Sequence, residues 1–525
     1  MVDAQQKFDV IVIGSGIGGL TTAALLAKQK KRVLVLEQHF TAGGFTHGFK
    51  RQGKFHWDVG LHYVGEMGDA SPYRSIFNYL TNGKLQWQKM PDIFDKFVYP
   101  DFTFAVSSNI KQFQADLMQQ FPHEEAGIYK YFQDVQKAAN WFIFHCLFEL
   151  FPTFLQSLLQ LIFRQFGKIA SQTTQKYLDD NFQDIQLKAL LASQWGDYGL
   201  TPAHSCFGIH GVVVTHYFGG GWYPVGGGSA IVPPIIATIK EAGGKVITQR
   251  RVTEIIVEAG AAIGVKVANA AHPQQEPEMY YAPKIVSDAG AFNTYLKLIP
   301  PSVSLSDRES IYSFPKGEPV FTLYLGLKES AQKLGFEGEN HWIYSTYDHE
   351  ETGLAKSIDQ NDSPQFCYLS FPSLKNAAAQ GHTAEIISAA NYDDFSPWQK
   401  KSWRKRGANY GEIKSQITDS LIEFVEGHYP GFKNLIEYAE LSTPLTTEYF
   451  SASDRGSIYG IPCVPERLEQ PWIAAKTPVK NLYLTGTDTF SPGIVGAMMG
   501  GVKTACLMNG QLGFLKIMTN IIKGH

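Results

Sequence analysis

The chain has 525 residues, of which 44% are hydrophobic and 18% are charged, so it can bury a large core and has room for two or more domains. Its formal net charge of −3 argues against a nucleic-acid-binding protein, which needs a strongly basic face. The five cysteines show no zinc-site or redox-pair spacing, which predicts a reducing compartment and no structural metal.

A strand, a glycine turn and a helix are predicted at the start of the chain. Residues 8–13 are apolar and of strand length, and a helix is expected over residues 20–27. The glycines between them, Gly14, Gly16 and Gly19, form the pattern G-x-G-x-x-G. A second predicted strand, residues 33–36, ends at Glu37. This is the order of a Rossmann unit, in which the helix start favours a phosphate and the acid accepts ribose hydroxyls, and an acid at this position argues against a 2′-phosphate.

A second turn of the same kind is predicted near the end of the chain, in NLYLTGTDTFSPGIVGAMMGG, residues 481–501. A short strand would place Thr487 and Asp488 at its carboxyl end, and the start of the following helix would face a phosphate or a flavin ring. Asp488 either accepts a ribityl hydroxyl or caps the helix, and both roles can hold at once. Because FAD is long and needs contacts at both of its ends, we interpret the two turns as the two ends of one FAD site.

The segment between these turns predicts further strands. Residues 245–267 alternate like a β-meander with a turn at residues 259–264. Residues 284–290, KIVSDAG, follow as a strand that ends in a turn of small residues. Both segments are consistent with a sheet that is completed by distant parts of the chain.

The order of these segments resembles a known superfamily. The first strand unit, the loop QHFTAGGFTHGF, the meander and the TGTD stretch resemble the FAD-dependent amine oxidases and phytoene desaturases. Within that superfamily, the segments FHWDVGLHYVG, TPAH and WYPVGGGSAI resemble the retinol saturase and carotenoid isomerase branch. The resemblance covers most of residues 8–510.

This resemblance implies an α/β protein of the glutathione-reductase-like fold, with an FAD-binding Rossmann domain interleaved with an α+β substrate domain. The FAD-binding domain is expected from residues 1–74, 225–304 and 476–512, the substrate domain from residues 75–224 and 305–475, and an amphipathic tail from residues 513–525. The expected FAD contacts are Gly14, Ser15, Gly16, Gly18, Gly19, Glu37, Gln38, Gly44, Phe45, Thr46, Gly60, Val252, Gly486, Thr487, Asp488, Gly496 and Ala497.

Two features depart from the superfamily pattern. In the second loop, QHFTAGGFTHGF, superfamily members often have an arginine after the paired glycines. Here Gly43 and Gly44 are followed by Phe45, which either stacks on the flavin or packs against other side chains. The chain also has no second strand–GxGxxG–helix unit, so a separate NAD(P)H domain is not expected. NAD(P)H would then serve only as an indirect source of electrons.

The resemblance implies an oxidoreductase that saturates a carbon–carbon double bond of an apolar polyene, either a retinoid or a carotenoid. Isomerisation or desaturation of a carotenoid on the same scaffold is the first alternative. A non-catalytic lipid or isoprenoid escort is an alternative of another class. The intact residues Gly14, Gly16, Glu37 and Asp488 argue against the escort.

Adding hydrogen to a polyene requires a proton donor near the flavin. His62 and Tyr63 are candidates because they follow the loop that, by resemblance, approaches the flavin ring, and His216 is a third candidate. A single histidine is nevertheless more often structural. The aromatic residues of the expected substrate domain suit a long, flat ligand, although each one is more often an ordinary core residue. They are Trp87, Trp141, Trp195, Tyr198, Tyr217, Trp222, Tyr223, Tyr324, Trp342 and Tyr459.

Residues 141–163 predict an amphipathic helix with a kink at Pro152. Its polar stripe consists of His145, Glu149, Thr153, Ser157, Gln160 and Arg164. These polar breaks argue against a transmembrane span, so the helix either lies in a membrane surface or packs on a core, and the membrane surface is favoured. The expected location is therefore peripheral, on the cytoplasmic side of a membrane, with a docking helix near residues 141–164.

Two further segments carry weaker surface signals. In the tail, residues 514–522 repeat the amphipathic pattern, with Lys516, Asn520 and Lys523 on one side. Residues 400–406, KKSWRKR, are expected on a solvated helix face rather than in contact with lipid.

Overall fold

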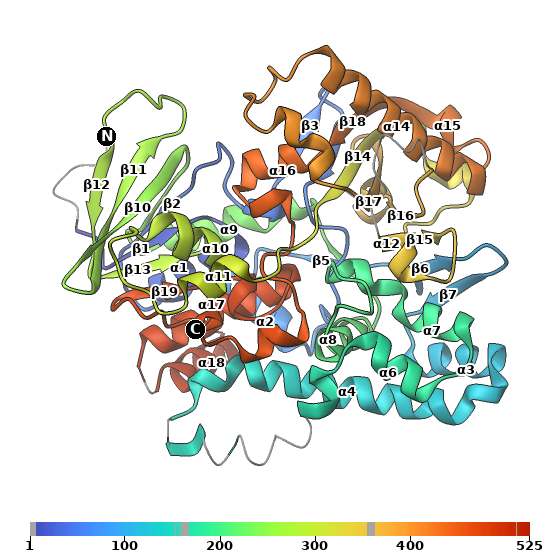
Figure 1. The fold of residues 1–525 in the computed structure, drawn as a ribbon, viewed down its shortest axis with the longest axis horizontal. Helices are drawn as coiled ribbons and strands as arrows, with labels where there is room; N and C mark the ends of the chain where they lie inside the picture. The colour runs from blue at the N-terminus through green and yellow to red at the C-terminus, as the bar shows by residue number, and fades with distance from the viewer. Residues whose placement is uncertain are drawn as a thin grey trace.

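The computed structural model describes residues 7–152, 154–156, 159, 167–353, 363–510 and 512–524. Two sheets lie side by side, with the strands β1, β13 and β19 to the left of Figure 1 and the strands β14 to β17 to its right. Helices cover the lower side of both sheets. The α/β fold class expected from the sequence is confirmed.

The first sheet is parallel and has the order β19-β13-β1-β2-β9. Its strands are β1 (Val10–Ile13), β2 (Val33–Leu36), β9 (Lys245–Ile247), β13 (Lys284–Ser287) and β19 (Leu482–Leu484). The strands β1 and β2 are fully buried, as continuous apolar runs in a sheet covered on both faces require. Helix α1 (Ile17–Ala27) packs against α9 (Val232–Glu241) and α17 (Gly493–Met508). The first and last strand units of the chain therefore belong to one sheet.

The predicted meander is partly correct. The antiparallel sheet is formed by β10 (Arg250–Glu258), β11 (Ala261–Asn269) and β12 (Glu278–Tyr281). Residues 245–247 do not belong to it, because they form β9 of the parallel sheet. The turn is also tighter than residues 259–264: it consists of Ala259 and Gly260, whose φ angles of 49° and 77° lie in the left-handed region.

The largest sheet is mixed and has the order β18-β14-β17-β16-β15-β6-β7. Its strands are β6 (Ile93–Val98), β7 (Thr103–Ser107), β14 (Val320–Leu327), β15 (Asn340–Tyr344), β16 (Phe366–Ser370), β17 (His382–Ala389) and β18 (Ile436–Ser442). The strands from residues 93–107 join those from residues 320–442, so the chain leaves this sheet and returns to it. Two antiparallel strand pairs lie outside the large sheets: the hairpin of β3 (Gly48–Arg51) with β4 (Phe55–Asp58), and β5 (Trp87–Lys89) with the distant β8 (Trp222–Pro224).

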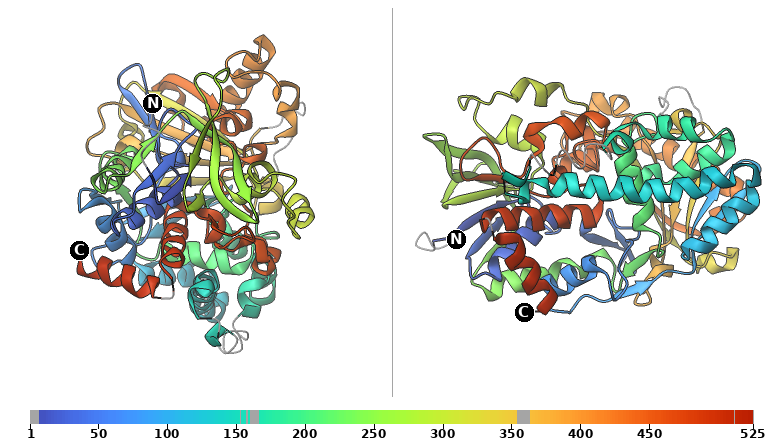
Figure 2. Two further views of the ribbon diagram at one scale, coloured as in Figure 1. Left: turned by 90° about the vertical axis from the view of Figure 1, so that its left-hand side faces the viewer. Right: turned by 90° about the horizontal axis from the view of Figure 1, so that it is seen from below.

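The remaining helices surround these sheets. They are α2 (Pro72–Thr81), α3 (Ile110–Gln120), α4 (Glu125–Leu147), α6 (Thr174–Asn181), α7 (Ile185–Ala192), α8 (Phe207–His216), α10 (Ala291–Asn293), α11 (Arg308–Ser313), α12 (His349–Gly353), α13 (Pro372–Lys375), α14 (Ala408–His428), α15 (Phe432–Leu435), α16 (Pro444–Ser451) and α18 (Gly513–Lys523). Helix α4 packs on α8 and runs along the underside of the molecule, as the right-hand view of Figure 2 shows.

The predicted membrane helix is wrong in its first part. Helix α4 ends at Leu147, ahead of Pro152, and a 3-10 turn, Phe148–Leu150, follows it. Phe142 and Cys146 are buried in the core. The stripe residue Glu149 is only partly exposed, and it forms an ion pair of 2.5 Å with the buried Lys503 of α17. The stripe residues Thr153, Ser157, Gln160 and Arg164 lie outside the described residues.

Two other surface expectations can be compared with the structure. Residues 400–406 form turns instead of a helix face, because α14 begins only at Ala408, and Arg406 is buried. The tail does form an amphipathic helix, α18, whose Ile517 and Ile521 are buried while Leu515 and Ile522 are exposed. Within the described part of the chain, no helix combines the length and hydropathy that crossing a bilayer would need.

Candidate functional site

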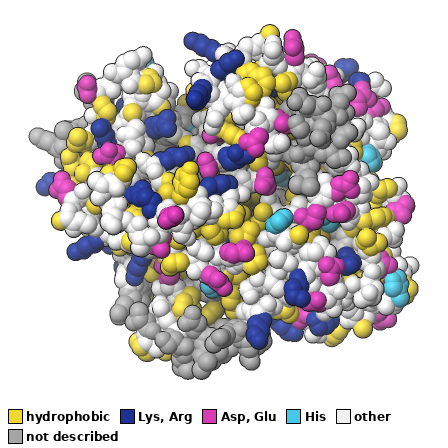
Figure 3. All heavy atoms as spheres, viewed as in Figure 1, with side chains coloured by type: hydrophobic (Ala, Val, Ile, Leu, Met, Phe, Trp, Pro, Cys, Tyr) yellow, Lys and Arg dark blue, Asp and Glu magenta, His cyan; other side chains and the backbone are white. Residues whose placement is uncertain are grey.

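A cavity of about 1530 Å³ runs from the first glycine turn to the largest sheet. Most pockets for small ligands hold roughly 300–1,000 Å³, so this cavity has room for a cofactor together with a substrate. Gly14 and Glu37 lie on its wall at one end, and Trp195 and Tyr368 lie on its wall at the other. Figure 3 shows a recess near the centre of one face of the molecule.

The two glycine turns meet at one end of this cavity. A Cβ atom on Gly18 would stand 2.4 Å from the Cα of Gly486, and one on Gly501 would stand 2.6 Å from the backbone oxygen of Gly18. Gly14 adopts a φ of +93°, which residues with side chains rarely tolerate. The start of α1 and the turn before α17 can therefore approach each other only because these positions are glycine.

Glu37 lies at the first turn, at the end of β2. Its Oε2 accepts hydrogen bonds from the backbone N–H of Ser15 at 2.8 Å and from the Ser15 hydroxyl at 2.7 Å. Its Oε1 accepts from the N–H of His39 at 2.7 Å. Only 7% of Glu37 is exposed, and it lines the cavity. A fixed carboxylate with lone pairs to spare is a suitable acceptor for the hydroxyls of a ribose.

Asp488 also lines the cavity, but it does not cap α17, which begins at Gly493 without a side-chain cap. Its Oδ2 accepts from the N–H of Ala291 at 2.6 Å, at the start of the short helix α10. Its Oδ1 accepts from the N–H of Ile461 at 2.8 Å. Asp488 therefore links the segments at Ala291 and Ile461 beside the second turn. This role differs from the helix cap expected from the sequence.

Sequence reasoning missed Asp288, which directly follows β13 and lies between the two turns. Its carboxyl oxygens would be 2.5 Å from a Cβ on Gly16 and 2.4 Å from a Cβ on Gly486. Burial raises the pKa of Asp288 to about 7; repulsion from Glu37 and Asp488 adds to this rise, and the N–H groups of Gly16 and Gly19 oppose it. The signal was the aspartate in KIVSDAG, which had been taken only as part of a turn of small residues.

Most of the predicted cofactor residues line the cavity. They are Gly14, Ser15, Gly16, Gly18, Glu37, Gln38, Gly44, Phe45, Thr46, Gly60, Val252, Thr487, Asp488 and Ala497. Gly19, Gly486 and Gly496 do not line it. They lie where a Cβ would come within 2.6 Å of another atom of the chain, so they are required for close packing behind the wall.

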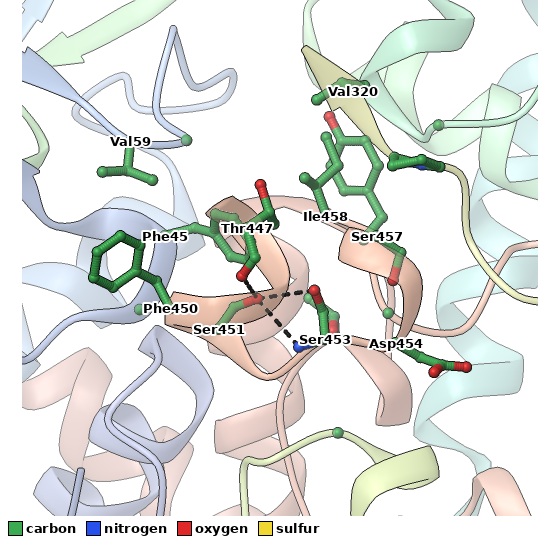
Figure 4. Close-up of a pocket in the computed structure, with 18 of the residues that line it drawn as sticks. Phe45, Val59, Val320, Thr447, Phe450, Ser451, Ser453, Asp454, Ser457 and Ile458 are labelled. Carbon is green, nitrogen blue, oxygen red and sulfur yellow. Dashed lines mark hydrogen bonds between the residues drawn. The ribbon is translucent and has the colours of Figure 1, made fainter. Parts of the chain in front are cut away.

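The wall near the second loop is formed by Phe45 rather than by an arginine. A Cβ on Gly60 would lie 3.0 Å from the Cβ of Phe45, so the two residues pack closely. Figure 4 shows Phe45 and Val59 on this wall, and the Ser451 hydroxyl donating to the Oγ of Ser453 at 2.8 Å. This part of the cavity is therefore apolar on one side and carries hydroxyl groups on another.

The structure separates the three proton-donor candidates. His62 lines the cavity, and its Nδ1 lies 2.9 Å from Oε2 of the buried Glu385. Tyr63 does not line it, because its hydroxyl lies behind the wall, 2.8 Å from Asp197 and 3.1 Å from Asp95.

His216 does not line the cavity either. Its Nε2 accepts from the N–H of Gly65 at 2.9 Å, and its Nδ1 lies 2.9 Å from Glu66. His216 thus holds the chain next to the wall, and the expectation that it faces the substrate is wrong.

Four of the ten aromatic candidates line the cavity, namely Trp195, Tyr324, Trp342 and Tyr459. The others pack elsewhere in the protein. Sequence reasoning missed Phe366 and Tyr368, which also lie on the wall. The rings of Trp342 and Tyr368 meet edge to face at 4.6 Å, and the buried Nε1 of Trp342 has no hydrogen-bond partner among the described residues. The far end of the cavity is therefore aromatic.

Comparison with known proteins gives three findings. The model of an "NAD(P)-binding Rossmann-like domain" family matches residues 12–80. The all-trans-retinol 13,14-reductase of Danio rerio is 34% identical over 95% of this chain and 85% of its own length, and prolycopene isomerase 2 of an Oncidium hybrid cultivar is 26% identical over 98% and 86%. The solved structure of cyclohexylamine oxidase from Brevibacterium oxydans has a TM-score of 0.60 and 13% identity, and the match covers 98% of this chain and all of that one.

Proposed function

The chain belongs to the family of all-trans-retinol 13,14-reductases, and from this premise we propose that it is an FAD-dependent enzyme that saturates a carbon–carbon double bond of a retinoid. The observation that carries the proposal is a cavity that joins the glycine turns to a part lined by aromatic rings. We call this part the aromatic chamber; its rings are those of Trp195, Tyr324, Trp342, Phe366, Tyr368 and Tyr459. A dinucleotide at the turns and an apolar polyene in the chamber would share this space. Prolycopene isomerases are also similar to this chain, but at lower identity, so isomerisation is the second candidate and not the first.

The residues at the turns fit FAD. Gly14, Gly16 and Gly18 line the cavity without side chains, Glu37 is available for the ribose, and Asp488 is available for a ribityl hydroxyl. When bound, FAD would supply the hydride. Because the described residues contain a single parallel Rossmann-type sheet, we propose NAD(P)H only as an indirect source of electrons.

The chain's own residues would handle the polyene and the proton. An aromatic chamber excludes the water that could trap a carbocation, and the faces of Trp195 and Trp342 can stabilise its positive charge. The proton must come from a group on the cavity wall. Of the three donors that the sequence suggests, His62 lies on this wall, whereas Tyr63 and His216 do not.

The proposed reaction can be tested directly. The protein is reconstituted with FAD, reduced without oxygen and incubated with all-trans-retinol or with prolycopene. We expect a product of retinol that has gained two hydrogen atoms, detected by chromatography and mass spectrometry. A product of unchanged mass and altered double-bond geometry would favour the isomerase, and a protein that holds the polyene but no FAD would favour the escort.

The position of Asp288 predicts that FAD binding depends on pH. Ionised Asp288 would repel the pyrophosphate, so FAD should bind to the form in which this carboxyl is neutral. Because its folded pKa is about 7, the affinity is expected to fall about tenfold per unit above pH ~7. Asp288→Asn should bind FAD with little pH dependence, and calorimetry from about pH 6 to about pH 9 measures this. The control Asp69→Asn, at an exposed position, should behave like the wild type, and a pH-dependent Asn variant would refute the idea.

The same carboxyl should affect the stability of the cofactor-free protein. A raised folded pKa means that stability is complete below the ordinary value of 3.8 and is lost as the pH rises towards about 7. Asp288→Asn should therefore raise the thermal midpoint of the cofactor-free protein most clearly above neutral pH.

We also propose that the protein binds peripherally to the cytoplasmic side of a membrane. Because Phe142 is buried and Glu149 is paired with Lys503, we assign this role to exposed apolar side chains of α18 and of the segment after Pro152. Phe154 is 77% exposed, and Leu515 on α18 is 62% exposed. Lys516 beside Leu515 suits anionic lipid headgroups.

The double variant Phe154→Asp with Leu515→Asp tests this surface. Each side chain contributes roughly 1.5–3 kcal/mol when it is buried in lipid, so binding to vesicles that contain phosphatidylserine should fall at least about tenfold. Tyr312→Asp, which alters a residue that is 76% exposed on α11, is the matched control and should keep binding. Co-sedimentation measures the effect, and a wild-type protein that never sediments with vesicles would exclude the membrane.

A further inference from the structure

A carboxyl group that the sequence did not single out lies on the cavity wall. Asp197 ends the 3-10 turn Ser193–Asp197, between Trp195 and Tyr198. A Cβ on Gly196 would stand 2.8 Å from the ring of Trp342, and one on Gly199 would stand 2.5 Å from the ring of Tyr459. Close packing on both sides therefore fixes the segment that carries Asp197 against the aromatic chamber.

Behind the wall, Asp197 shares one hydroxyl with a second carboxyl. The Oη of Tyr63 lies 2.8 Å from Oδ2 of Asp197 and 3.1 Å from Oδ2 of Asp95. A phenol has one proton to donate, and burial raises the pKa of Tyr63, so it keeps that proton. Two buried carboxylates around one hydroxyl would repel each other strongly. One of the two carboxyls is therefore expected to carry a proton of its own.

The surrounding groups indicate which carboxyl is protonated. Asp95 accepts from the amide of Asn340 at 2.9 Å and from that of Gln194 at 3.0 Å, which favours its ionised form. The buried cation Lys375 also donates to Asn340, on the Asp95 side. For Asp197, Tyr63 is the hydrogen-bond partner found among the described residues.

The electrostatic environment also favours a protonated Asp197 and an ionised Asp95. Burial raises the pKa of Asp95 to about 7, and the amides of Asn340 and Gln194 limit the rise. Burial raises the pKa of Asp197 well above its ordinary value of 3.8, and repulsion from Asp95 adds to the effect, while Tyr63 and Lys375 oppose it. The other titratable groups that face Asp197 are Tyr198, Tyr217, Tyr344, Tyr368 and Tyr459. All are tyrosines with raised pKa values, so they remain neutral.

We propose that Asp197 is the acid that protonates the polyene, and that Tyr63 is a positioning residue that holds it. This inference rests on the proposed saturation reaction. The O–H bond of Asp197 breaks and a C–H bond forms at one carbon of the double bond. The neighbouring carbon receives a hydride, with its two electrons, from the reduced cofactor. Asp197 is left as a carboxylate and takes up one proton from solvent before the next turnover.

Infrared spectroscopy tests the protonation of Asp197 without any turnover. The wild type at neutral pH should show a carboxylic-acid carbonyl band that is absent from Asp197→Asn. The matched control is Asp134→Asn, because Asp134 is also buried and accepts from a tyrosine, Tyr177 at 3.0 Å, but it is paired with Lys130 and Lys137. Its replacement should leave the band unchanged. If the difference spectrum between the wild type and Asp197→Asn contains no carboxylic-acid band, the proposal is overturned even if the protein reduces retinol.

Kinetics provide the second test. Asp197→Asn should lower kcat about 10²–10⁴-fold with normal FAD content, the usual cost of losing a general acid. Tyr63→Phe should shift the basic limb of the pH–rate profile, as a positioning role requires. If Asp197→Asn keeps wild-type turnover while His62→Gln loses it, the proton comes from His62 and the proposal is wrong. If the wild type shows the band but never adds hydrogen to a polyene, the proposed function fails while the assignment of the proton stands.

Discussion

Replacing Gly18 by alanine is expected to abolish stable FAD binding and to lower the free energy of unfolding. The new Cβ would lie 2.4 Å from the Cα and 2.7 Å from the nitrogen of Gly486, and both are backbone atoms that cannot rotate away. Overpacking in a tight core costs typically about 1–3 kcal/mol, and the cost should exceed this range where two backbones must separate. Because the same movement would open the junction of the two turns, the flavin content should fall together with stability.

Gly411→Ala is the matched control for this change. Gly411 also lies in a helix, α14, but a Cβ there would have no atom within 4 Å. Since alanine is the better helix former, this variant should gain up to about 1 kcal/mol. Chemical denaturation and flavin absorbance of the two purified variants measure both effects. A Gly18→Ala protein with normal stability and normal flavin content would show that the close approach of the turns is not required.

Replacing Lys503 by methionine should destabilise the protein by about 3–5 kcal/mol, the usual cost of removing one partner of a buried ion pair. Lys503 is 3% exposed, its Nζ lies 2.5 Å from Glu149, and it also donates to the backbone oxygen of Thr489 at 3.1 Å. Glu149 in turn accepts from the N–H of Ala475 at 2.9 Å. This pair connects the turn after α4 to α17, so its loss would leave a half-buried carboxylate without its cation.

The double variant Lys503→Met with Glu149→Met separates the pair from the packing around it. With both charges removed, the loss should be clearly smaller than in Lys503→Met alone, because no unpaired charge remains. Burial alone would raise the pKa of Glu149, but Lys503 and two backbone N–H groups outweigh it and lower the pKa. The contribution of Glu149 is therefore complete above its ordinary value of 4.5 and is lost as the pH falls through the lowered folded value. Equal destabilisation of the single and double variants would contradict this account.

The sequence pattern predicted those parts of the protein whose structure depends on residues close together in the chain. The strands of residues 10–13 and 33–36 are continuous apolar runs, the turn between them needs glycine at Gly14, and an acid follows at Glu37. These features depend on neighbours within one unit of the chain, so the Rossmann sheet could be predicted. The second glycine turn was also visible, and residues of both turns line one cavity, while their interpretation as the two ends of one FAD site stays a prediction.

Patterns of hydrophobicity failed where a distant partner changed the meaning of a polar residue. The pattern assigns Glu149 to a solvent-facing stripe, but in the structure it is half-buried and paired with the distant, buried Lys503. The alternation near residue 245 suited a meander, but pairing with β2 placed Lys245–Ile247 in the parallel sheet. Neither partner can be inferred from the spacing of residues along one segment.

The candidate site shows the same division. The sequence by itself determined the glycine turns and Glu37, and it singled out His62 and Tyr63 as one pair of candidates. Only the tertiary structure decided that Tyr63 lies behind the wall and that Asp197 lies on it, because Tyr63, Asp95 and Asp197 come from three separate segments. The direction of a side chain and the proton that it holds depend on burial and on the charges that folding brings near it, and those exist only once the distant segments have packed together.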